Sequence, residues 1–356
     1  MNVEIIFPPL EAGLAALLEY LSAHVLTCLI PAFFIAGAIT ALLKKDTVLK
    51  YFGADANKCV CYSIAATSGT VLAVCSCTIL PMFAGIHRKG AGIGPAASFL
   101  FSGPAINVLA VLLTARVLGL DLGAARVAAA VSMAVVIGLV MAFIFERGGV
   151  SQKSAPQAPL IGADDENGRP SYISPIFLAL LVGILLGATS GFAWQIKTSL
   201  VSALILVSAW MLKTYFLEEE RSDFIGESWW LARKIFPLLL IGTFVTGVIG
   251  YFLPVDLIKQ VFGTSNFAAC FVAAMTGALL YMPTLLEVPI VGTLFGYTSG
   301  VMAPGPALSL LLAGPSMSLP NMIVIWRIIG AKKAGVYILL VVILSTLMGM
   351  IYGVVA

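Results

Sequence analysis

Residues 94–107, GPAASFLFSGPAIN, return in altered form at residues 305–318 as GPALSLLLAGPSMS. Each stretch carries two Gly-Pro pairs, and the first pair is separated from the second by the same number of residues in both. Further upstream, the triplet YFG that ends at Gly53 returns as VFG ending at Gly263. Because a self-similarity kept at a nearly fixed separation is the sequence signature of duplicated structure, we predict that the chain contains two related halves.

The composition places these halves in a membrane. Of the 356 residues, 60% are apolar and 10% are charged, against about 25% charged in soluble domains. Uncharged runs long enough to cross about 30 Å of hydrocarbon cover residues 21–43, 59–86, 91–115, 127–145, 170–196, 235–255, 260–286, 288–326 and 334–356, with a shorter run at 198–212. We therefore exclude a water-soluble globule and expect an all-α polytopic membrane protein.

Two polar stretches interrupt the apolar runs and set the domain boundaries. The first, at 147–171, has the Gly, Pro, Ser and acidic composition of a flexible linker, and the second lies at 213–234. We expect a first repeat half at 1–147, a second half at 232–356, and polar loops with two linking membrane helices at 148–231. The pattern GxxxxGK[ST] of a phosphate-binding loop occurs in neither polar stretch, so we expect no built-in ATPase. The net charge of +3 is no guide to partners, because basic residues in membrane proteins mainly report which side of the bilayer a loop lies on. We expect no nucleic-acid partner.

The orientation of the halves depends on the Gly- and Pro-interrupted runs at 59–86 and 266–296, which can be full crossings or re-entrant hairpins. If both turn back and the N-terminus is outside, sixteen of the twenty Lys and Arg residues lie on the cytoplasmic side. The four left outside are Arg116, Arg126, Lys197 and Lys259. Membrane insertion selects for such a bias. We therefore predict two inverted structural repeats, each with a re-entrant helical hairpin and a broken helix, and about eight full spans plus two hairpins, ten membrane segments in all.

Two Cys-x-Cys pairs lie in the first of these runs, Cys59 with Cys61 and Cys75 with Cys77. On a regular helix, residues i and i+2 point about 200° apart, so both thiols face one ligand only where the helix is unwound. Soft thiolates favour Cu(I), Hg(II), Zn and trivalent arsenic. We predict that Cys75 and Cys77 contact a thiophilic cargo and that Cys59 and Cys61 lie at its entrance. The alternative is that they pack as small hydrophobic residues.

The Gly-Pro breaks are the second candidate for a binding site. A proline inside an apolar helix removes a hydrogen bond and frees backbone groups, and broken helices at matching positions of two halves mark the substrate site of many transporters. The candidate substrate-binding residues in and beside the breaks are Ser102, Gly103, Pro104, Asn107, Pro283, Gly314, Pro315, Ser316 and Asn321. The alternative is that the small residues serve close helix packing.

Glu287, in the stretch YMPTLLEVP, is an acid inside a long apolar segment. An intramembrane carboxylate is a functional-site hypothesis by default, so we consider Glu287 a proton-coupling candidate. The alternative is a structural role, in which the carboxylate pairs with a hydroxyl or with an amide of unwound backbone.

Residues 75–111, CSCTILPMFAGIHRKGAGIGPAASFLFSGPAINVLAV, resemble the signature region of the permease family that includes the organoarsenical efflux permeases. The resemblance extends over most of the chain. It implies a permease of the prokaryotic cytoplasmic membrane that exports trivalent organoarsenicals such as methylarsenite. Cys75, Cys77 and residues 102–107 occupy the matching positions. We expect this cargo and membrane lipid as partners, and no cofactor.

Other functions fit part of the pattern. A permease for another thiophilic species, such as mercury, copper or a selenium compound, uses the same thiols. An intramembrane thiol oxidoreductase could use Cys75 and Cys77, but it needs a quinone or a redox partner and leaves the repeated Gly-Pro breaks unexplained. A structural subunit of a larger complex explains the hydrophobicity but not the polar breaks. We therefore expect a transporter that works by alternating access, not an enzyme.

Overall fold

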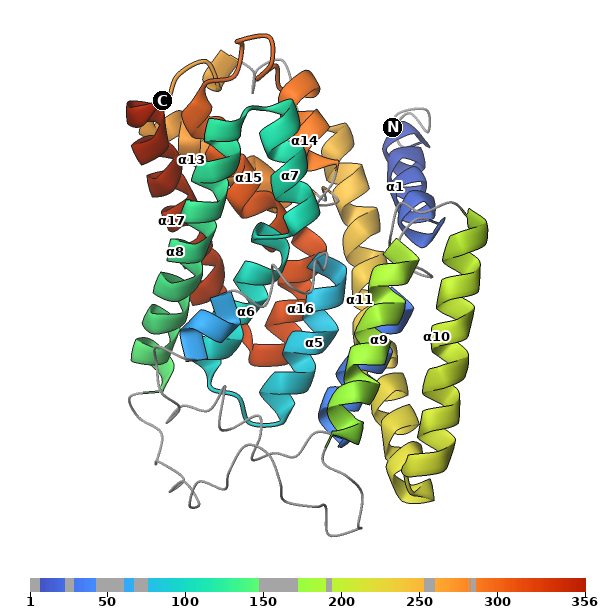
Figure 1. Ribbon diagram of the computed structural model, residues 1–356. Helices are drawn as coiled ribbons and strands as arrows, with labels where there is room; N and C mark the ends of the chain where they lie inside the picture. Colours follow the sequence, from blue (N-terminus) through green and yellow to red (C-terminus); the bar gives the residue numbers. More distant parts are fainter. Residues whose placement is uncertain are drawn as a thin grey trace.

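The computed structural model describes residues 7–22, 29–42, 61–66, 76–146, 172–189, 194–252, 260–280, 282 and 286–356. Within these ranges the chain is helical apart from turns (Figure 1), as the sequence predicts. The helices are α1 (Phe7–Tyr20), α2 (Ile30–Leu42), α5 (Ser76–Arg88), α6 (Ile93–Ala105), α7 (Val108–Val117), α8 (Leu120–Phe145), α9 (Ile173–Thr189), α10 (Trp194–Tyr215), α11 (Glu218–Tyr251), α13 (Phe267–Leu279), α14 (Glu287–Pro289), the π-helical turn η3 (Ile290–Leu294), α15 (Pro304–Ser316), α16 (Leu319–Ile329) and α17 (Ala331–Val355).

Four of the described helices, α8, α10, α11 and α17, are long and apolar enough to cross a membrane. The pairs α6–α7 and α15–α16 each reach that length together, which raises the number of candidate spans to six. The expectation of about eight full spans is larger because it includes the runs that contain α2 and α9. These helices have 13 and 17 residues, or about 20 Å and 26 Å at 1.5 Å per residue. Each is therefore shorter than the hydrocarbon core of a bilayer.

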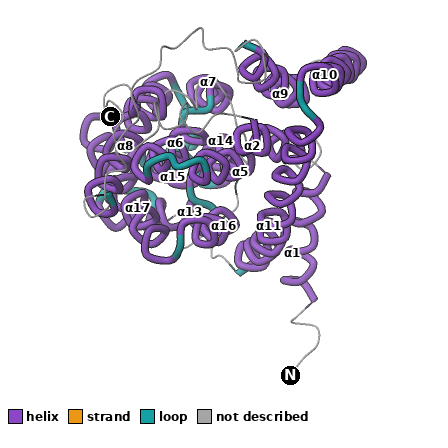
Figure 2. Tube along the Cα trace, turned by 90° about the horizontal axis from the view of Figure 1, so that it is seen from below, coloured by secondary structure: helices purple, strands orange, loops and turns teal. Residues whose placement is uncertain are grey.

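The first helix of each bent pair, α6 or α15, lies at the centre of the molecule. Seen from below, α6 and α15 are adjacent and other helices surround them, while α9 and α10 lie at the edge (Figure 2). Every residue of α6 is buried, and so is every residue of α15 after its first. Burial on all sides explains why these helices are apolar around their whole circumference.

Prolines end both central helices. α6 ends at Ala105, one residue after Pro104, and α15 ends at Ser316, one residue after Pro315. Proline has no N–H to donate to the preceding turn, and its ring clashes with the carbonyl four residues back. The helix that follows each break is bent from the first, by 44° for α6–α7 and by 49° for α15–α16. The predicted breaks are therefore present at both Gly-Pro pairs.

The bent pairs run in opposite directions through the molecule. In Figure 1, α6 lies below α7, whereas α15 lies above α16. A glycine with positive φ then turns the chain into the next long helix in both cases, Gly119 (φ 113°) before α8 and Gly330 (φ 84°) before α17. Glycine adopts this backbone region without the steric cost that a Cβ brings.

Matching glycines also bring the helices together. At Gly94 of α6, a Cβ would lie 2.6 Å from the carbonyl oxygen of Gly138 in α8. At Gly305 of α15, a Cβ would lie 2.8 Å from the carbonyl oxygen of Gly349 in α17. Small residues at a crossing let two backbones approach closely, which is a common device for packing helices inside membranes. The α6–α8 and α15–α17 crossings are therefore built in the same way.

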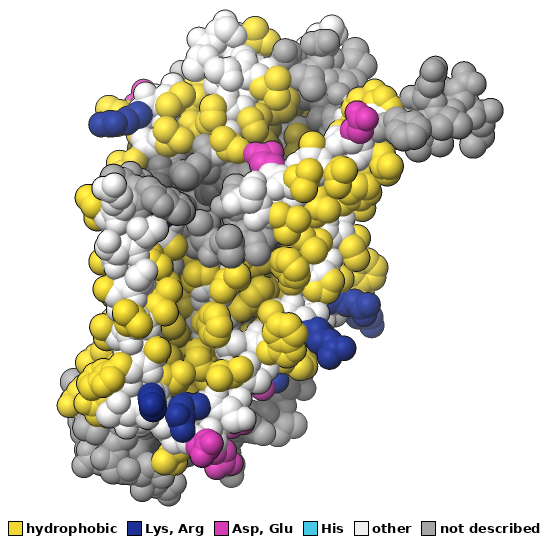
Figure 3. Space-filling view, turned by 90° about the vertical axis from the view of Figure 1, so that its right-hand side faces the viewer, with side chains coloured by type: hydrophobic (Ala, Val, Ile, Leu, Met, Phe, Trp, Pro, Cys, Tyr) yellow, Lys and Arg dark blue, Asp and Glu magenta, His cyan; other side chains and the backbone are white. Residues whose placement is uncertain are grey.

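The surface agrees with a membrane location. Hydrophobic side chains cover much of the face in Figure 3, and most of the basic side chains visible there lie toward its lower end. Exposed large apolar residues on α10, which lies at the edge of the molecule, include Leu206 and Trp210. Apolar surface of this extent is unfavourable in water but suits contact with lipid chains.

Candidate substrate pathway

The two breaks are in contact inside the protein. The Ser316 hydroxyl, at the end of α15, donates a hydrogen bond of 3.4 Å to the carbonyl oxygen of Phe101 in α6. The Ser102 hydroxyl donates at 2.6 Å to the carbonyl oxygen of Ala65, in the helical stretch 61–66. Both hydroxyls are buried. Polar groups of the first and second breaks therefore share one enclosed region.

Most of the predicted binding residues fall in this region. The last turn of α6 holds Ser102, Gly103 and Pro104, and Asn107 lies between α6 and α7. The end of α15 holds Gly314, Pro315 and Ser316, and the first turn of α16 holds Asn321. All eight residues are buried. The Asn321 Oδ1 atom and the nearby Ser318 hydroxyl are also buried, and neither has a hydrogen-bond partner within the described part of the chain. Buried polar atoms are nearly always satisfied in folded proteins, so these two are candidates for contacts to a cargo.

Only some of the predicted thiol residues lie within the described part of the chain. Cys59, Cys75 and Pro283 lie outside the described residues, and Cys77 is placed by its backbone in the first turn of α5. Cys61 is described, and its thiol is free and buried. In the ranges the model describes, no group of three or more His, Cys, Asp or Glu side chains is arranged to hold a metal ion. Ligation of a cargo by Cys75 and Cys77 stays a prediction.

Glu287 is completely buried and forms an ion pair with Arg126 of α8, which is completely buried too. One guanidinium nitrogen, Nη2, donates to the Glu287 Oε1 atom. The other two guanidinium nitrogens bond to the bent pair α6–α7. Nη1 donates to the Thr114 hydroxyl in α7 at 2.9 Å, and Nε donates to the carbonyl oxygen of Ala105 at the end of α6 at 3.4 Å. Among the described residues, the partner of Glu287 is thus a cation rather than a hydroxyl or a backbone amide.

The position of Arg126 corrects the sequence analysis, which placed this residue in an outside loop. Arg126 immediately precedes the uncharged run at 127–145, so the charge count places it in the loop before a membrane span. In the structure α8 begins at Leu120, and Arg126 lies nearly two turns inside it, facing the interior. The sequence does indicate that a cation lies near Glu287, because an acid buried in an apolar segment needs a positive partner. The sequence did not show which of the twenty Lys and Arg residues supplies it.

A second ion pair lies at the opposite end of the molecule. Arg88, the last residue of α5, pairs with Glu227 of α11, and its guanidinium carbon lies 4.1 Å from the centre of the Trp230 ring. The neighbouring Lys89 is half-buried, and burial lowers its pKa, an effect that Glu227 partly offsets. These partly exposed groups connect α5 to α11 at the end that the charge distribution predicts to be cytoplasmic.

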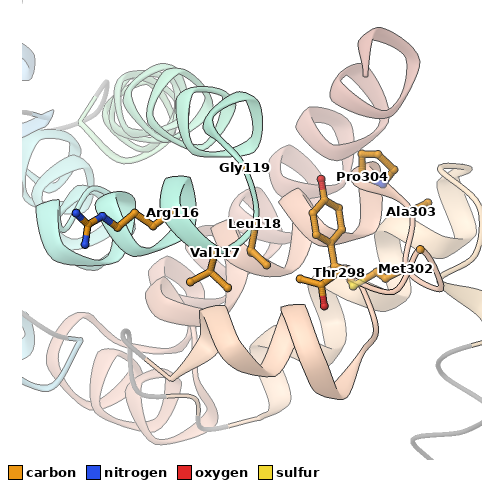
Figure 4. A pocket seen from close by; sticks show the side chains of 10 residues that line it. Arg116, Val117, Leu118, Gly119, Thr298, Met302, Ala303 and Pro304 are labelled. Atoms are coloured by element: carbon orange, nitrogen blue, oxygen red, sulfur yellow. The ribbon is translucent and has the colours of Figure 1, made fainter.

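A pocket of about 680 Å³ opens at the end of the molecule where α7 meets α8 (Figure 4). Its walls are the turn that contains Leu118 and Gly119 and the loop from Tyr297 to Pro304, so they come from both predicted halves. The Arg116 side chain points away from Met302 and Pro304 in this view. Burial raises the pKa of Tyr297, and Asp121 raises it further.

Comparison with known proteins identifies the family. The family model ArsP_1, described as a predicted permease, matches residues 12–354. The chain belongs to the ArsP_1 family. It is therefore a multi-pass membrane permease for a small molecule, and a transporter rather than an enzyme. This result confirms the family that the resemblance at residues 75–111 indicated.

Two relatives of this ArsP_1 protein are known by family designations. The UPF0718 protein MJ0584 of the archaeon Methanocaldococcus jannaschii is 41% identical over 351 residues, which cover 95% of this chain and 94% of the relative. The UPF0718 protein YraQ of Escherichia coli is 24% identical over 305 residues, which cover 84% of this chain and 68% of the relative. No solved structure matches the chain.

Proposed function

We propose that this permease exports a small soft-metalloid species, trivalent organoarsenicals such as methylarsenite above all, across the prokaryotic cytoplasmic membrane by alternating access. The observation that carries the proposal is the contact between the two helix breaks, where the Ser316 hydroxyl reaches the Phe101 carbonyl. Broken helices expose backbone dipoles at mid-membrane, and in many transporters the substrate binds between two such breaks. The choice of cargo rests on the resemblance of residues 75–111 to the organoarsenical permeases.

Two inverted repeats provide the movement in this proposal. The opposite directions of α6–α7 and α15–α16 support it. The paired crossings Gly94–Gly138 and Gly305–Gly349 support it too, because equivalent contacts are expected from duplicated halves. We assign residues 1–147 and 232–356 to the halves and 148–231 to the linking helices and loops. The hairpins of residues 59–86 and 266–296 enter from opposite faces and bring their tips to the central breaks.

The proposed site combines soft sulfur with these polar breaks. Cys75 and Cys77 ligate the arsenic, each thiol giving its proton to a hydroxyl group that leaves as water. Ser102–Asn107 and Gly314–Asn321 bind these hydroxyl groups before they leave. Two thiols allow release where a third would hold the cargo too tightly, since affinity must change between the transport states. Cys59 and Cys61 lie at the cytoplasmic entrance. Glu287 carries a proton in exchange for cargo.

The test compares single thiol variants in a metalloid-sensitive bacterial host. Cys75→Ser and Cys77→Ser are each expected to reduce resistance to methylarsenite more than Cys28→Ser or Cys270→Ser, because serine keeps the size but loses the softness that selects the cargo. Cys270 is a matched control, since it is free and buried in α13. Amounts of folded protein are equalised by fluorescence-detected size exclusion.

The same host decides between cargoes. Protection against mercuric ion or arsenite, but not against methylarsenite, would replace the organoarsenical by another thiophilic species. Normal export by both Cys75→Ser and Cys77→Ser would remove sulfur ligation from the mechanism and leave the polar breaks as the site. A host that gains no resistance to any of the three compounds, despite folded protein in its membrane, refutes soft-metalloid export.

A further inference from the structure

Arg126 connects three elements through one side chain. Its three hydrogen bonds reach Ala105 at the end of α6, Thr114 in α7 and Glu287 in α14. Arginine suits this position because its planar guanidinium presents donors in a fixed fork, whereas lysine offers a single point charge. The first broken helix, through Ala105 and Thr114, therefore fixes the direction of the guanidinium. The guanidinium in turn fixes the carboxylate of Glu287.

Arg126 and Glu287 balance each other's charge inside the protein. On the helices that pack against the pair, the remaining charged side chains are Arg116, Asp121, Lys332 and Lys333, each within the first three or last two residues of its helix. Among the described residues of α6, α7, α8, α15 and α17, Arg126 is thus the one basic residue that is buried in the interior. A guanidinium stays protonated in proteins, so the pair cannot be neutralised by loss of a proton from Arg126.

One carboxylate oxygen of Glu287 is left free. Oε1 accepts a hydrogen bond from Arg126, but Oε2 is buried and accepts no hydrogen bond from the part of the chain that the structure describes. A Cβ placed on Gly314, at the second break, would lie 3.8 Å from Oε2, so this oxygen faces the end of α15. Leaving a buried charged acceptor without a partner is costly. The oxygen is therefore ready for a donor.

We propose that Arg126 is the positioning residue of the transport site. It holds Glu287 by Oε1 and aims Oε2 at the second break. There Oε2 accepts a hydrogen bond from a hydroxyl of the incoming cargo, before the thiols replace that hydroxyl, or it accepts a proton in transit. This inference rests on the proposed transport function and extends it, because it makes an arginine of the first half responsible for the acid of the second. Through the Ala105 carbonyl it also makes Oε2 sensitive to the shape of the first break.

A labelling experiment tests the positioning without any cargo. Dicyclohexylcarbodiimide reacts with a protonated carboxyl: the acid proton moves to a carbodiimide nitrogen, the carboxyl oxygen bonds to the carbodiimide carbon, and rearrangement gives a stable N-acylurea with no leaving group. Peptide mass spectrometry locates the adduct at Glu287 in native membranes. Arg126→Gln should increase the adduct at least about fivefold, because an opposite charge in contact favours the ionised carboxylate by about tenfold or more.

Matched variants separate positioning from simple folding. Arg233→Gln, at an exposed position on α11, is the control for loss of an arginine and should label like the wild type. Arg126→Lys keeps the charge but not the fork, so it should keep Glu287 protected. In uptake of methylarsenite by everted vesicles, Arg126→Lys should raise the half-saturating concentration about tenfold or more, because one lost hydrogen bond to a charged group weakens binding by about that factor. Its maximal rate should stay within about twofold of the wild type.

The double variant Arg126→Gln with Glu287→Gln distinguishes the two donors. It leaves no uncompensated buried charge, and its amide oxygen can accept a hydroxyl but carries no proton. Methylarsenite binding that persists without accumulation against a gradient assigns Oε2 to the proton, whereas binding and accumulation that both persist assign it to the cargo hydroxyl.

Equal Glu287 labelling in Arg126→Gln and Arg233→Gln overturns the positioning role. Transport by Arg126→Lys with the wild-type half-saturating concentration overturns it as well. If the wild type fails to move methylarsenite, the proposed cargo is wrong, while the labelling comparison still decides the role of Arg126.

Discussion

Gly277 of α13 provides a quantitative test of the central packing. It packs against the end of α15, where an added Cβ would lie 3.0 Å from the Gly314 nitrogen, 3.1 Å from the Leu310 carbonyl oxygen and 3.2 Å from the Gly314 Cα. All three neighbours are backbone atoms, so no side chain can rotate away. Gly277→Ala therefore forces α13 and α15 apart by a few tenths of an ångström, next to the oxygen of Glu287 that faces Gly314.

The expected cost follows from two opposing terms. Adding a methyl group to a packed interior lowers the free energy of unfolding by about 1–3 kcal/mol. Replacing glycine by alanine inside a helix raises it by about 0.5–1 kcal/mol. From the middle of each range, the net loss of stability for Gly277→Ala is about 1 kcal/mol. With a shift of roughly 2 °C for each kcal/mol in a chain of this size, the melting temperature should fall by about 2 °C.

Gly183→Ala in α9 is the matched control. Its added Cβ would meet its nearest neighbour, Leu204 Cδ1, at an ordinary 3.7 Å, so the helix propensity acts alone and the melting temperature should stay or rise. Both variants are measured in the same detergent by the loss of the monodisperse size-exclusion peak after heating. Gly277→Ala that melts at or above the wild type would show that α13 and α15 do not approach as described.

Two further predictions address the buried network and the orientation. Thr114→Val removes the acceptor for Arg126 Nη1 and should lower stability by about 1–3 kcal/mol, more than Thr346→Val, whose hydroxyl bonds within its own helix; equal losses would contradict the network. In a background without native thiols, a cysteine near Lys44 should react with an impermeant maleimide from the cytoplasm alone, and one near Ser299 from outside alone. Reaction of both from the same side would make the halves parallel.

The helix breaks could be predicted because their cause is local. Pro104 and Pro315 lack an N–H wherever they stand in the fold, so a Gly-Pro pair inside an apolar run predicts an interrupted helix without knowledge of its neighbours. Membership of the permease family was equally accessible, since residues 75–111 carry the resemblance in consecutive positions. Glu287 stood out because charge is rare within a long apolar segment.

The contacts of these residues could not be predicted because they depend on the approach of distant helices. Arg126 lies at the edge of an apolar run, where a headgroup anchor and an interior residue give the same sequence pattern. The rotation of α8 about its axis decides between the two, and neighbouring helices set that rotation. The crossing of Gly94 with Gly138 was hidden for the same reason, because a glycine in a membrane helix does not indicate which backbone approaches it.

The position of α9 and α10 at the edge of the molecule affects how the protein adapts to membranes of different thickness. α10 has 22 residues, about 33 Å of helix, and it exposes Leu206 and Trp210 away from the central helices. A helix longer than the hydrocarbon core fits a thinner bilayer by tilting. We expect α10 to tilt against α9 in such a bilayer while α6 and α15, enclosed by other helices, keep their geometry. A change in lipid composition would then be taken up by the outer pair before it reaches the polar breaks at the centre.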